Sequence, residues 1–107
     1  MDKLGKQLKY AELYAIYHDL LSSSRSSILD SYFNYDLSIS EIADNLSISR
    51  AAVEDAIKVG TNKLDELEKT LGIAAKNKVI KDNINNIRES NGKNIEQYLT
   101  NIEKVIK

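Results

Sequence analysis

The sequence has no cysteine and no proline, and it holds only four glycines and a single histidine. Without cysteine, disulfide bonds, thiolate nucleophiles and cysteine-ligated zinc are excluded, and one histidine cannot make a zinc site alone. We therefore expect no metal and no cofactor. No apolar run approaches the roughly 18 residues that a membrane span needs, and the start MDKLGKQLKY is too polar for a signal peptide. These absences predict a cytoplasmic protein without a membrane segment.

The residues that are present favour helix over sheet. Ala, Leu, Ile, Lys and Glu occur throughout, and no segment alternates apolar and polar residues in steps of two. A chain of 107 residues supports one modest core. The sequence therefore predicts a small all-α protein.

Two helices are expected before residue 37. Tyrosine and leucine recur at three- and four-residue steps from Asp2 to Leu21, which predicts one helix. Its expected core face is Tyr10, Leu13, Tyr14, Tyr17, Leu20 and Leu21. Ser24 as N-cap predicts the start of a second helix that ends near Asp36. The expected buried face of that helix is Ile28, Leu29, Tyr32 and Phe33.

The stretch LSISEIADNLSISRAAVEDAIK, from Leu37 to Lys58, predicts two capped helices around a short turn. Ser38 followed by Glu41 is a capping box, which predicts a helix from Ile39 to about Asn45. Ser49 is the expected N-cap of the next helix, so only Leu46 to Ile48 remain for the turn. This is helix-turn-helix spacing, with Ser47 where many such motifs have glycine at positive φ. The expected shared core is Ile42, Ala43, Leu46, Ile48, Val53 and Ile57.

The second helix of the motif should be long, because Leu64, Leu67 and Leu71 continue its apolar stripe. Gly72 suits a left-handed C-terminal cap. Gly60 costs about 1 kcal/mol relative to alanine inside a helix. It therefore indicates either a close contact with a neighbouring element or a slight bend.

The tracts DLSISEIA and SRAAVEDAIK, with LYAIYHDLLSSSR upstream, carry a family resemblance. The chain resembles the YlxM-type helix-turn-helix proteins of bacteria, whose motif is similar to the promoter-reading fourth region of sigma factors. The resemblance covers roughly Leu13 to Leu71. It implies an all-helical, DNA-binding-like protein that takes part in the signal recognition particle pathway. Ala51 and Val59 depart from the glutamine and arginine that the family tends to have.

Residues at the start of the long helix are the candidates for nucleic-acid contact: Ser49, Arg50, Ala51, Glu54 and Lys58. Arg50 could bond guanine through two hydrogen bonds, worth about 1–3 kcal/mol of discrimination. In the alternative, Arg50, Glu54 and Lys58 pair with each other along a solvated face at about 0.3–0.5 kcal/mol per pair. The sequence leaves both alternatives open.

The charges are divided unevenly along the chain. Residues 1–70 hold 12 acidic and 8 basic side chains, a net charge of −4, whereas residues 71–107 hold 4 acidic and 7 basic ones, a net charge of +3. A DNA-binding domain usually gathers basic side chains where it docks. The distribution therefore weighs against tight binding of a duplex by the helix-turn-helix alone.

The last third of the chain predicts two amphipathic helices around a turn at Asn91-Gly92. Ile80, Ile84 and Ile87 line one helix; Ile95, Leu99, Ile102 and Ile106 line the other and form the expected partner or dimer interface. These helices either fold back on the rest of the chain or pack against a second copy; we favour a homodimer. Their basic residues either meet RNA phosphates or serve as solubilising charges. The expected organisation is a helix-turn-helix domain over residues 1–73 and a helical extension over residues 74–107.

Nothing in the sequence predicts an enzyme. The carboxylates Asp65, Glu66, Glu68 and Asp82 are spaced as on a solvated helix face, and no nucleophile motif accompanies them. Two functions remain. One is a DNA-binding helix-turn-helix regulatory protein. The other is an accessory module of the signal recognition particle that binds its protein or its RNA and uses the helix-turn-helix only as a scaffold.

Overall fold

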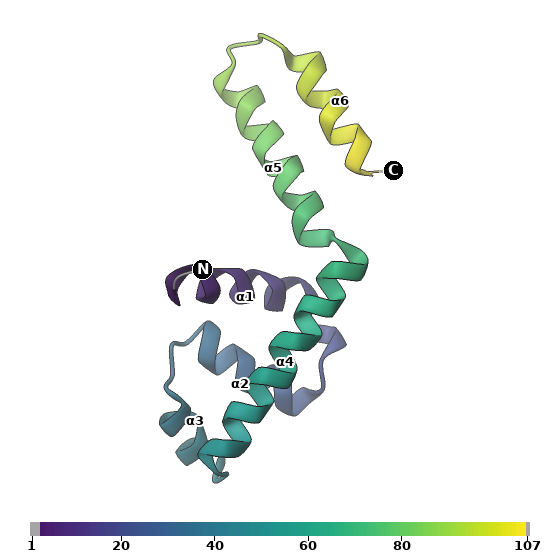
Figure 1. Cartoon of the computed structure of the whole chain (residues 1–107). Coiled ribbons are helices and arrows are strands. Elements are labelled where there is room, and N and C mark those ends of the chain that lie inside the picture. The colour runs from purple at the N-terminus through teal and green to yellow at the C-terminus, as the bar shows by residue number, and fades with distance from the viewer. Residues whose placement is uncertain (1–2, 107) are drawn as a thin grey trace. The chain divides into compact units, whose positions relative to one another are not determined.

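The computed structural model describes residues 3–106, which form helices joined by short connections (Figure 1). This part of the chain contains six α-helices and one short 3₁₀ helix, and no strand. The elements are α1 (Lys3–Tyr17), η1 (His18–Leu20), α2 (Ser23–Phe33), α3 (Ile39–Leu46), α4 (Arg50–Leu71), α5 (Ile73–Glu89) and α6 (Ile95–Ile106). The prediction of a small all-α protein is confirmed.

The chain divides into two compact units, residues 1–71 and residues 72–107. Helices α1 to α4 belong to the first unit, and α5 and α6 belong to the second. The division lies two residues before the boundary that the sequence suggested.

The first unit is built around α4, its longest helix, against which α1, α2 and α3 each pack. Every buried apolar side chain of residues 3–106 lies in this unit. These side chains are Leu13, Tyr17, Ile28, Leu29, Phe33, Ile42, Ala43, Val53 and Leu64. They include members of the stripes predicted on each of the four helices, so one core holds the unit together.

The first helix is shorter than expected. It ends at Tyr17, and the chain continues as the 3₁₀ turn η1, closed by a hydrogen bond from Leu21 N to His18 O at 3.1 Å. The expected start at Asp2 lies outside the described residues. Because a 3₁₀ turn has three residues per turn rather than 3.6, Leu20 leaves the apolar stripe and is 57% exposed. The prediction that Leu20 belongs to the core face is therefore wrong.

The second helix starts one residue before Ser24 and is capped by Ser22. Ser22 has extended backbone angles, and its hydroxyl accepts a hydrogen bond from the Arg25 amide at 3.4 Å. The prediction of Ser24 as N-cap is therefore wrong. Several successive serines can each act as a cap, so the local sequence alone does not select one. The helix ends at Phe33 rather than near Asp36, because Asp36 adopts a left-handed backbone with φ of 55°.

Gly60 lies where α4 crosses α2. A methyl group at this position would lie 2.7 Å from Leu29 Cδ1, and Leu29 is fully buried. The close contact predicted as one explanation for Gly60 is therefore confirmed.

The second unit is a pair of helices, α5 and α6, that pack against each other. Asn91, Gly92 and Asn94 all have positive φ in the turn between them, which confirms the turn expected at Asn91-Gly92. Gly72, which begins the unit, has the expected left-handed backbone. In the described part of this unit no apolar side chain is fully buried, and Asn83 is the only buried residue.

Candidate nucleic-acid interface

The start of α3 is fixed by a complete capping box. The Glu41 amide donates to Ser38 Oγ at 3.0 Å, and the Ser38 amide donates to Glu41 Oε1 at 3.0 Å. The backbone hydrogen bond from Ser38 lowers the pKa of the Glu41 carboxyl, and the Ser38 side chain contributes in the same direction. Both groups of the box had been predicted from their spacing, and the structure confirms them.

The turn between α3 and α4 is made by one left-handed residue. Ser47 has φ 56° and ψ 42°, the conformation for which glycine is the usual choice. The Ile48 amide donates to Ala43 O at 3.1 Å, which closes the end of α3. Ser49 then caps α4, since its hydroxyl accepts from the Ala52 amide at 3.0 Å. The turn is therefore as short as predicted.

The two helices share a core that is smaller than expected. Ile42, Ala43 and Val53 are at most 4% exposed and cluster with Ile28 of α2, and Ile57 packs against this cluster. Leu46 and Ile48 do not belong to the core, because their side chains are 46% and 39% exposed. Both flank Ser47, where the left-handed backbone changes the direction of the chain. Their expected burial is wrong, whereas that of Ile42, Ala43 and Val53 is confirmed.

The five candidate contact residues lie together on the first turns of α4 and at its cap. Ser49, Arg50, Ala51, Glu54 and Lys58 are all exposed. Among the described residues, no ion pair joins Arg50, Glu54 and Lys58 to one another or to any other side chain. The charged groups at the start of α4 therefore face solvent, where a ligand could reach them.

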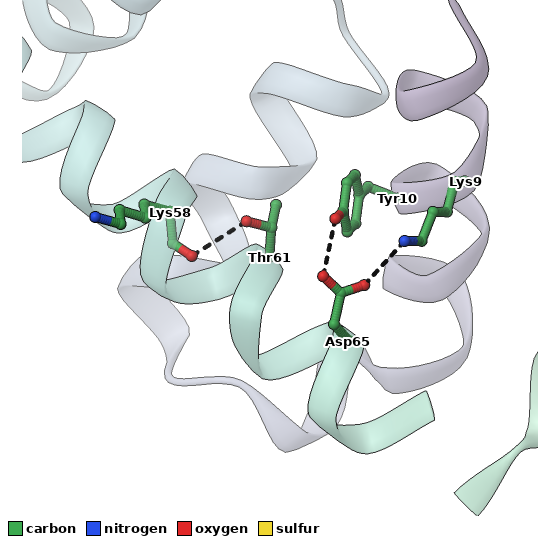
Figure 2. A network of polar contacts seen from close by, with 5 residues as sticks. All are labelled: Lys9, Tyr10, Lys58, Thr61 and Asp65. Atoms are coloured by element: carbon green, nitrogen blue, oxygen red, sulfur yellow. Dashed lines mark hydrogen bonds and ion pairs between the residues drawn. The ribbon is translucent and has the colours of Figure 1, made fainter. Parts of the chain in front are cut away.

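Lys58 belongs to the region where α4 passes α1, shown in Figure 2. Its carbonyl accepts a hydrogen bond from Thr61 Oγ1 at 3.1 Å, while its ammonium group points away from the neighbouring contacts between α1 and α4. Lys58 therefore keeps its charge at the surface.

A groove of about 670 Å³ extends from the start of α4 to α1. Its basic side chains are Lys3 and Lys6 of α1 and Arg50 of α4, and its apolar lining includes Phe33 and Ile57. Lys3 and Lys6 were not among the predicted contact residues. More than forty residues separate them from Arg50 in the sequence, so only the packing of α1 beside α4 brings them to the same groove.

A polar network anchors α1 to α4 beside this surface. Asp65 accepts a hydrogen bond from the Tyr10 hydroxyl at 2.9 Å and forms an ion pair with Lys9 Nζ at 3.2 Å (Figure 2). Burial is the main cause that raises the pKa of Tyr10, and the bond to Asp65 adds to it; the same carboxylate raises the pKa of Lys9.

The network corrects one expectation about the acidic residues of α4. Asp65 accepts from Tyr10, and Glu68 accepts from the Tyr17 hydroxyl at 2.7 Å. The prediction that both belong only to a solvated face is therefore wrong. Sequence spacing within α4 could not reveal these bonds, because the tyrosines come from a helix more than fifty residues away.

The predicted partner interface lies on α6. Leu99 and Ile106 are 40% and 68% exposed, and Ile95 and Ile102 are half-buried. Residues 3–106 hold no group of three or more acidic or histidine side chains that could bind a metal. In the same part of the chain no helix has the length and hydropathy to cross a membrane.

Two crossed helices, a three-residue connection through a left-handed serine and an exposed helix start define a helix-turn-helix protein. The family described as "Putative helix-turn-helix protein, YlxM / p13 like" matches residues 4–105. The chain belongs to this family, UPF0122, which confirms the resemblance seen in the sequence.

Individual relatives agree with this assignment. A UPF0122 protein of Mycoplasma capricolum is 37% identical over 103 residues, which cover 96% of this chain and 90% of the relative. A UPF0122 protein of Fusobacterium nucleatum is 35% identical over 100 residues, covering 92% and 97%. One from Acetivibrio thermocellus is 42% identical over 73 residues, covering 68% and 62%. The similarity to the first two extends through both units of the chain.

Proposed function

We propose that the chain is a cytoplasmic, DNA-binding helix-turn-helix regulatory protein that acts as a homodimer. The observation that carries the proposal is the exposed start of α4, with Arg50 one residue after the capping Ser49. In helix-turn-helix proteins the N-terminal residues of the second helix contact base edges in the major groove. The capped turn before α4 holds this end of the helix in a fixed direction.

The exposed side chains suit different parts of a duplex. Arg50 can donate two hydrogen bonds to guanine, Ala51 can contact a thymine methyl group, and Glu54 can accept from cytosine. Ser49 and Lys58 can donate to phosphate oxygens, which position the protein without reading sequence. Arg50 is the residue on which sequence preference should depend most.

The groove beside Arg50 supplies further basic side chains for phosphate contact. Lys3 and Lys6 line it, and neither forms an ion pair with another described residue. The groove also contains two exposed carboxylates: Glu41 accepts from the Ser38 amide at 3.0 Å, and Asp36 accepts from Gln7 at 3.5 Å. A phosphate backbone approaching this groove would therefore meet three basic groups and two carboxylates, a net charge of +1.

Replacement of Arg50 by alanine tests the proposal. We expect Arg50→Ala to lose about 1–3 kcal/mol of discrimination between a selected duplex and a random one, because the guanine contact is lost. Fluorescence anisotropy with both duplexes measures this difference. Lys69→Ala is a matched control, because it removes one exposed basic charge near the other end of α4. It should leave the preference unchanged.

The salt dependence of the same titration gives an independent measure. If basic side chains contact phosphates, log affinity should fall linearly with log salt at a slope of about −0.9 per phosphate contacted. Lys6→Ala should make this slope less steep by about 1 and should keep the sequence preference. Failure to bind any duplex at 50 mM salt would contradict the DNA-binding proposal.

A second candidate function is an accessory module of the signal recognition particle that binds its protein or RNA. The observation that favours it is the acidic charge of residues 1–70, together with exposed Glu54 and Asp55 on the helix that should approach phosphates. Here the helix-turn-helix would be a scaffold, and the basic residues 71–107 would supply the contacts.

One titration separates the two functions. The chain is titrated with a random duplex, with a signal recognition particle RNA hairpin, and with the particle's protein subunit. Under the second function only the hairpin or the subunit binds, and Arg50→Ala changes nothing. Substitution of exposed Leu99 should then abolish capture of the hairpin or the subunit.

A further inference from the structure

The helical pair α5–α6 lacks the apolar core that a stable unit of its size needs. Its apolar side chains remain 37–40% exposed at Ile73, Val79, Ile84 and Leu99, and 68% exposed at Ile106. Below about 40 residues, chains rarely form a sufficient core without disulfides, metals or association with another surface. The unit spans residues 72–107 and holds no cysteine. Association with another surface is therefore the available source of stability.

The buried centre of the pair is polar instead. Asn83 is 8% exposed; its amide donates to Val79 O at 2.7 Å, and its oxygen accepts from Asn101 Nδ2 at 3.0 Å. Gln97 Nε2 in turn donates to Asn101 Oδ1 at 3.1 Å. A chain of amide hydrogen bonds thus crosses from α6 to α5. A buried asparagine in a helical interface fixes register and number of helices at a cost in stability.

The apolar positions outside this centre repeat as in a helical bundle. Ile95, Leu99, Ile102 and Ile106 follow steps of four, three and four residues, and Ile80, Ile84 and Ile87 follow steps of four and three. Such alternating steps form a seam that packs against similar helices at a shallow angle. Leu99 and Ile84, one from each helix, are both 40% exposed and are available for such packing.

The charges of the two helices favour a second copy of the same pair. Helix α5 carries four basic and two acidic side chains, a net charge of +2, whereas α6 carries one basic and two acidic ones, a net charge of −1. In a twofold arrangement the same patch of each copy meets the other, so α5 can lie against α6 of the partner. Each helix then faces one of opposite net charge, which favours this pairing over one between like helices.

We infer that two copies of the chain associate through α5 and α6 into a four-helix bundle, and that the Asn83–Asn101 pair sets its register. The inference rests on the proposed function, because it names the interface of the proposed homodimer. Its test, however, needs no nucleic acid. The dimer would present two copies of α4, the number that a helix-turn-helix dimer uses on two half-sites.

Sedimentation equilibrium of the full chain tests the interface. The wild-type protein should have twice the 12.1 kDa mass of one chain. Leu99→Glu should weaken dimerisation by more than about 100-fold, because a twofold interface repeats the buried charge in both copies. Thr100→Glu is the matched control, since it adds the same charge at the next exposed position of α6. It should leave the dimer intact.

Circular dichroism on the same samples should show that Leu99→Glu retains at least the helical signal of residues 1–71, because the buried apolar core lies there. A single-chain mass for the wild-type protein at all concentrations would overturn the inference in favour of fold-back within one chain. A dimeric Leu99→Glu would overturn it too, because the interface would then lie elsewhere. Since these measurements contain no DNA, a failure of DNA binding leaves their result unaffected.

The role of the asparagine pair has its own test. Asn83→Leu with Asn101→Leu replaces both partners, so no unsatisfied amide remains between them. We expect sedimentation velocity to show dimers together with larger assemblies, because an apolar layer no longer specifies the number of helices. A double variant that stays a single dimeric species would overturn the register role and leave the interface itself standing.

Discussion

At the scale of single residues, Gly60 shows how one missing side chain permits two helices to cross. Alanine at this position would favour helix by about 1 kcal/mol. The added methyl group, however, would lie 2.7, 3.1 and 3.2 Å from three carbon atoms of Leu29, which is fully buried. Three contacts with one enclosed side chain leave it little room to move.

We therefore expect Gly60→Ala to lower the free energy of unfolding by about 1–2 kcal/mol, because overpacking of a core outweighs the gain in helix propensity. Urea denaturation followed by circular dichroism measures the change. Asn62→Ala, at an exposed position of the same helix, should have an effect near zero. Adding Leu29→Val to Gly60→Ala should recover part of the loss in a double-mutant cycle. A stabilised Gly60→Ala protein would contradict the steric explanation.

Other residues of the site depend on partners distant in sequence. The exposed position of Arg50 at the start of α4 could be predicted, because it directly follows a capping residue. Lys3 and Lys6 could not, because they reach the groove of Arg50 only through the packing of α1. The same holds for Asp65, whose spacing on α4 gives no sign of its bond to Tyr10.

At the scale of helices, the features that depend on local hydrogen bonds were predicted best from the sequence. The capping box at Ser38, the cap at Ser49 and the left-handed Gly72 were all expected, because each depends on only a few neighbouring residues. The predicted cap of α2 was wrong, because several successive serines could serve as the cap. The predicted end of α1 was wrong, because a 3₁₀ turn breaks the helical period.

The capping box also makes the stability of α3 depend on pH. The Glu41 pKa is lowered in the folded chain by the hydrogen bond from Ser38, so the ionised carboxylate stabilises the fold. This contribution is fully present above the pKa of an unfolded glutamate, about 4.3, and is lost as the pH falls through the lower folded value.

We expect Glu41→Gln to unfold with a weaker dependence on pH between about pH 5 and pH 3 than the wild-type chain, because glutamine keeps the hydrogen bond without titrating. Thermal unfolding followed by circular dichroism over this range measures the difference. Glu12→Gln removes an exposed carboxylate from α1 and should retain the wild-type slope. If the stability of the wild type and of Glu41→Gln changed equally with pH, the ionised carboxylate of the capping box would not stabilise the fold.

At the scale of the whole molecule, the two units differ in how they are stabilised. The unit of residues 1–71 encloses every fully buried apolar side chain of residues 3–106. The unit of residues 72–107 buries an asparagine and leaves its apolar stripes partly exposed. Amphipathic helices could be predicted here from sequence steps. The amide pair that joins them could not, because no sequence rule relates Asn83 to Asn101.

This difference predicts that residues 1–71 fold on their own. We expect the isolated segment to unfold cooperatively, with a Tm within about 5 °C of that of the same unit in the full chain, because its core is retained. It should sediment as a monomer, since α5 and α6 are absent. Thermal circular dichroism and sedimentation equilibrium measure the two properties. Residues 72–107 prepared alone should be helical only at concentrations where they associate.

A segment 1–71 without a cooperative transition would mean that its core needs residues 72–107. A dimeric segment 1–71 would place the association surface on α1 to α4. Cooperative folding of segment 1–71 as a monomer would instead place the apolar core in residues 1–71 and self-association in residues 72–107.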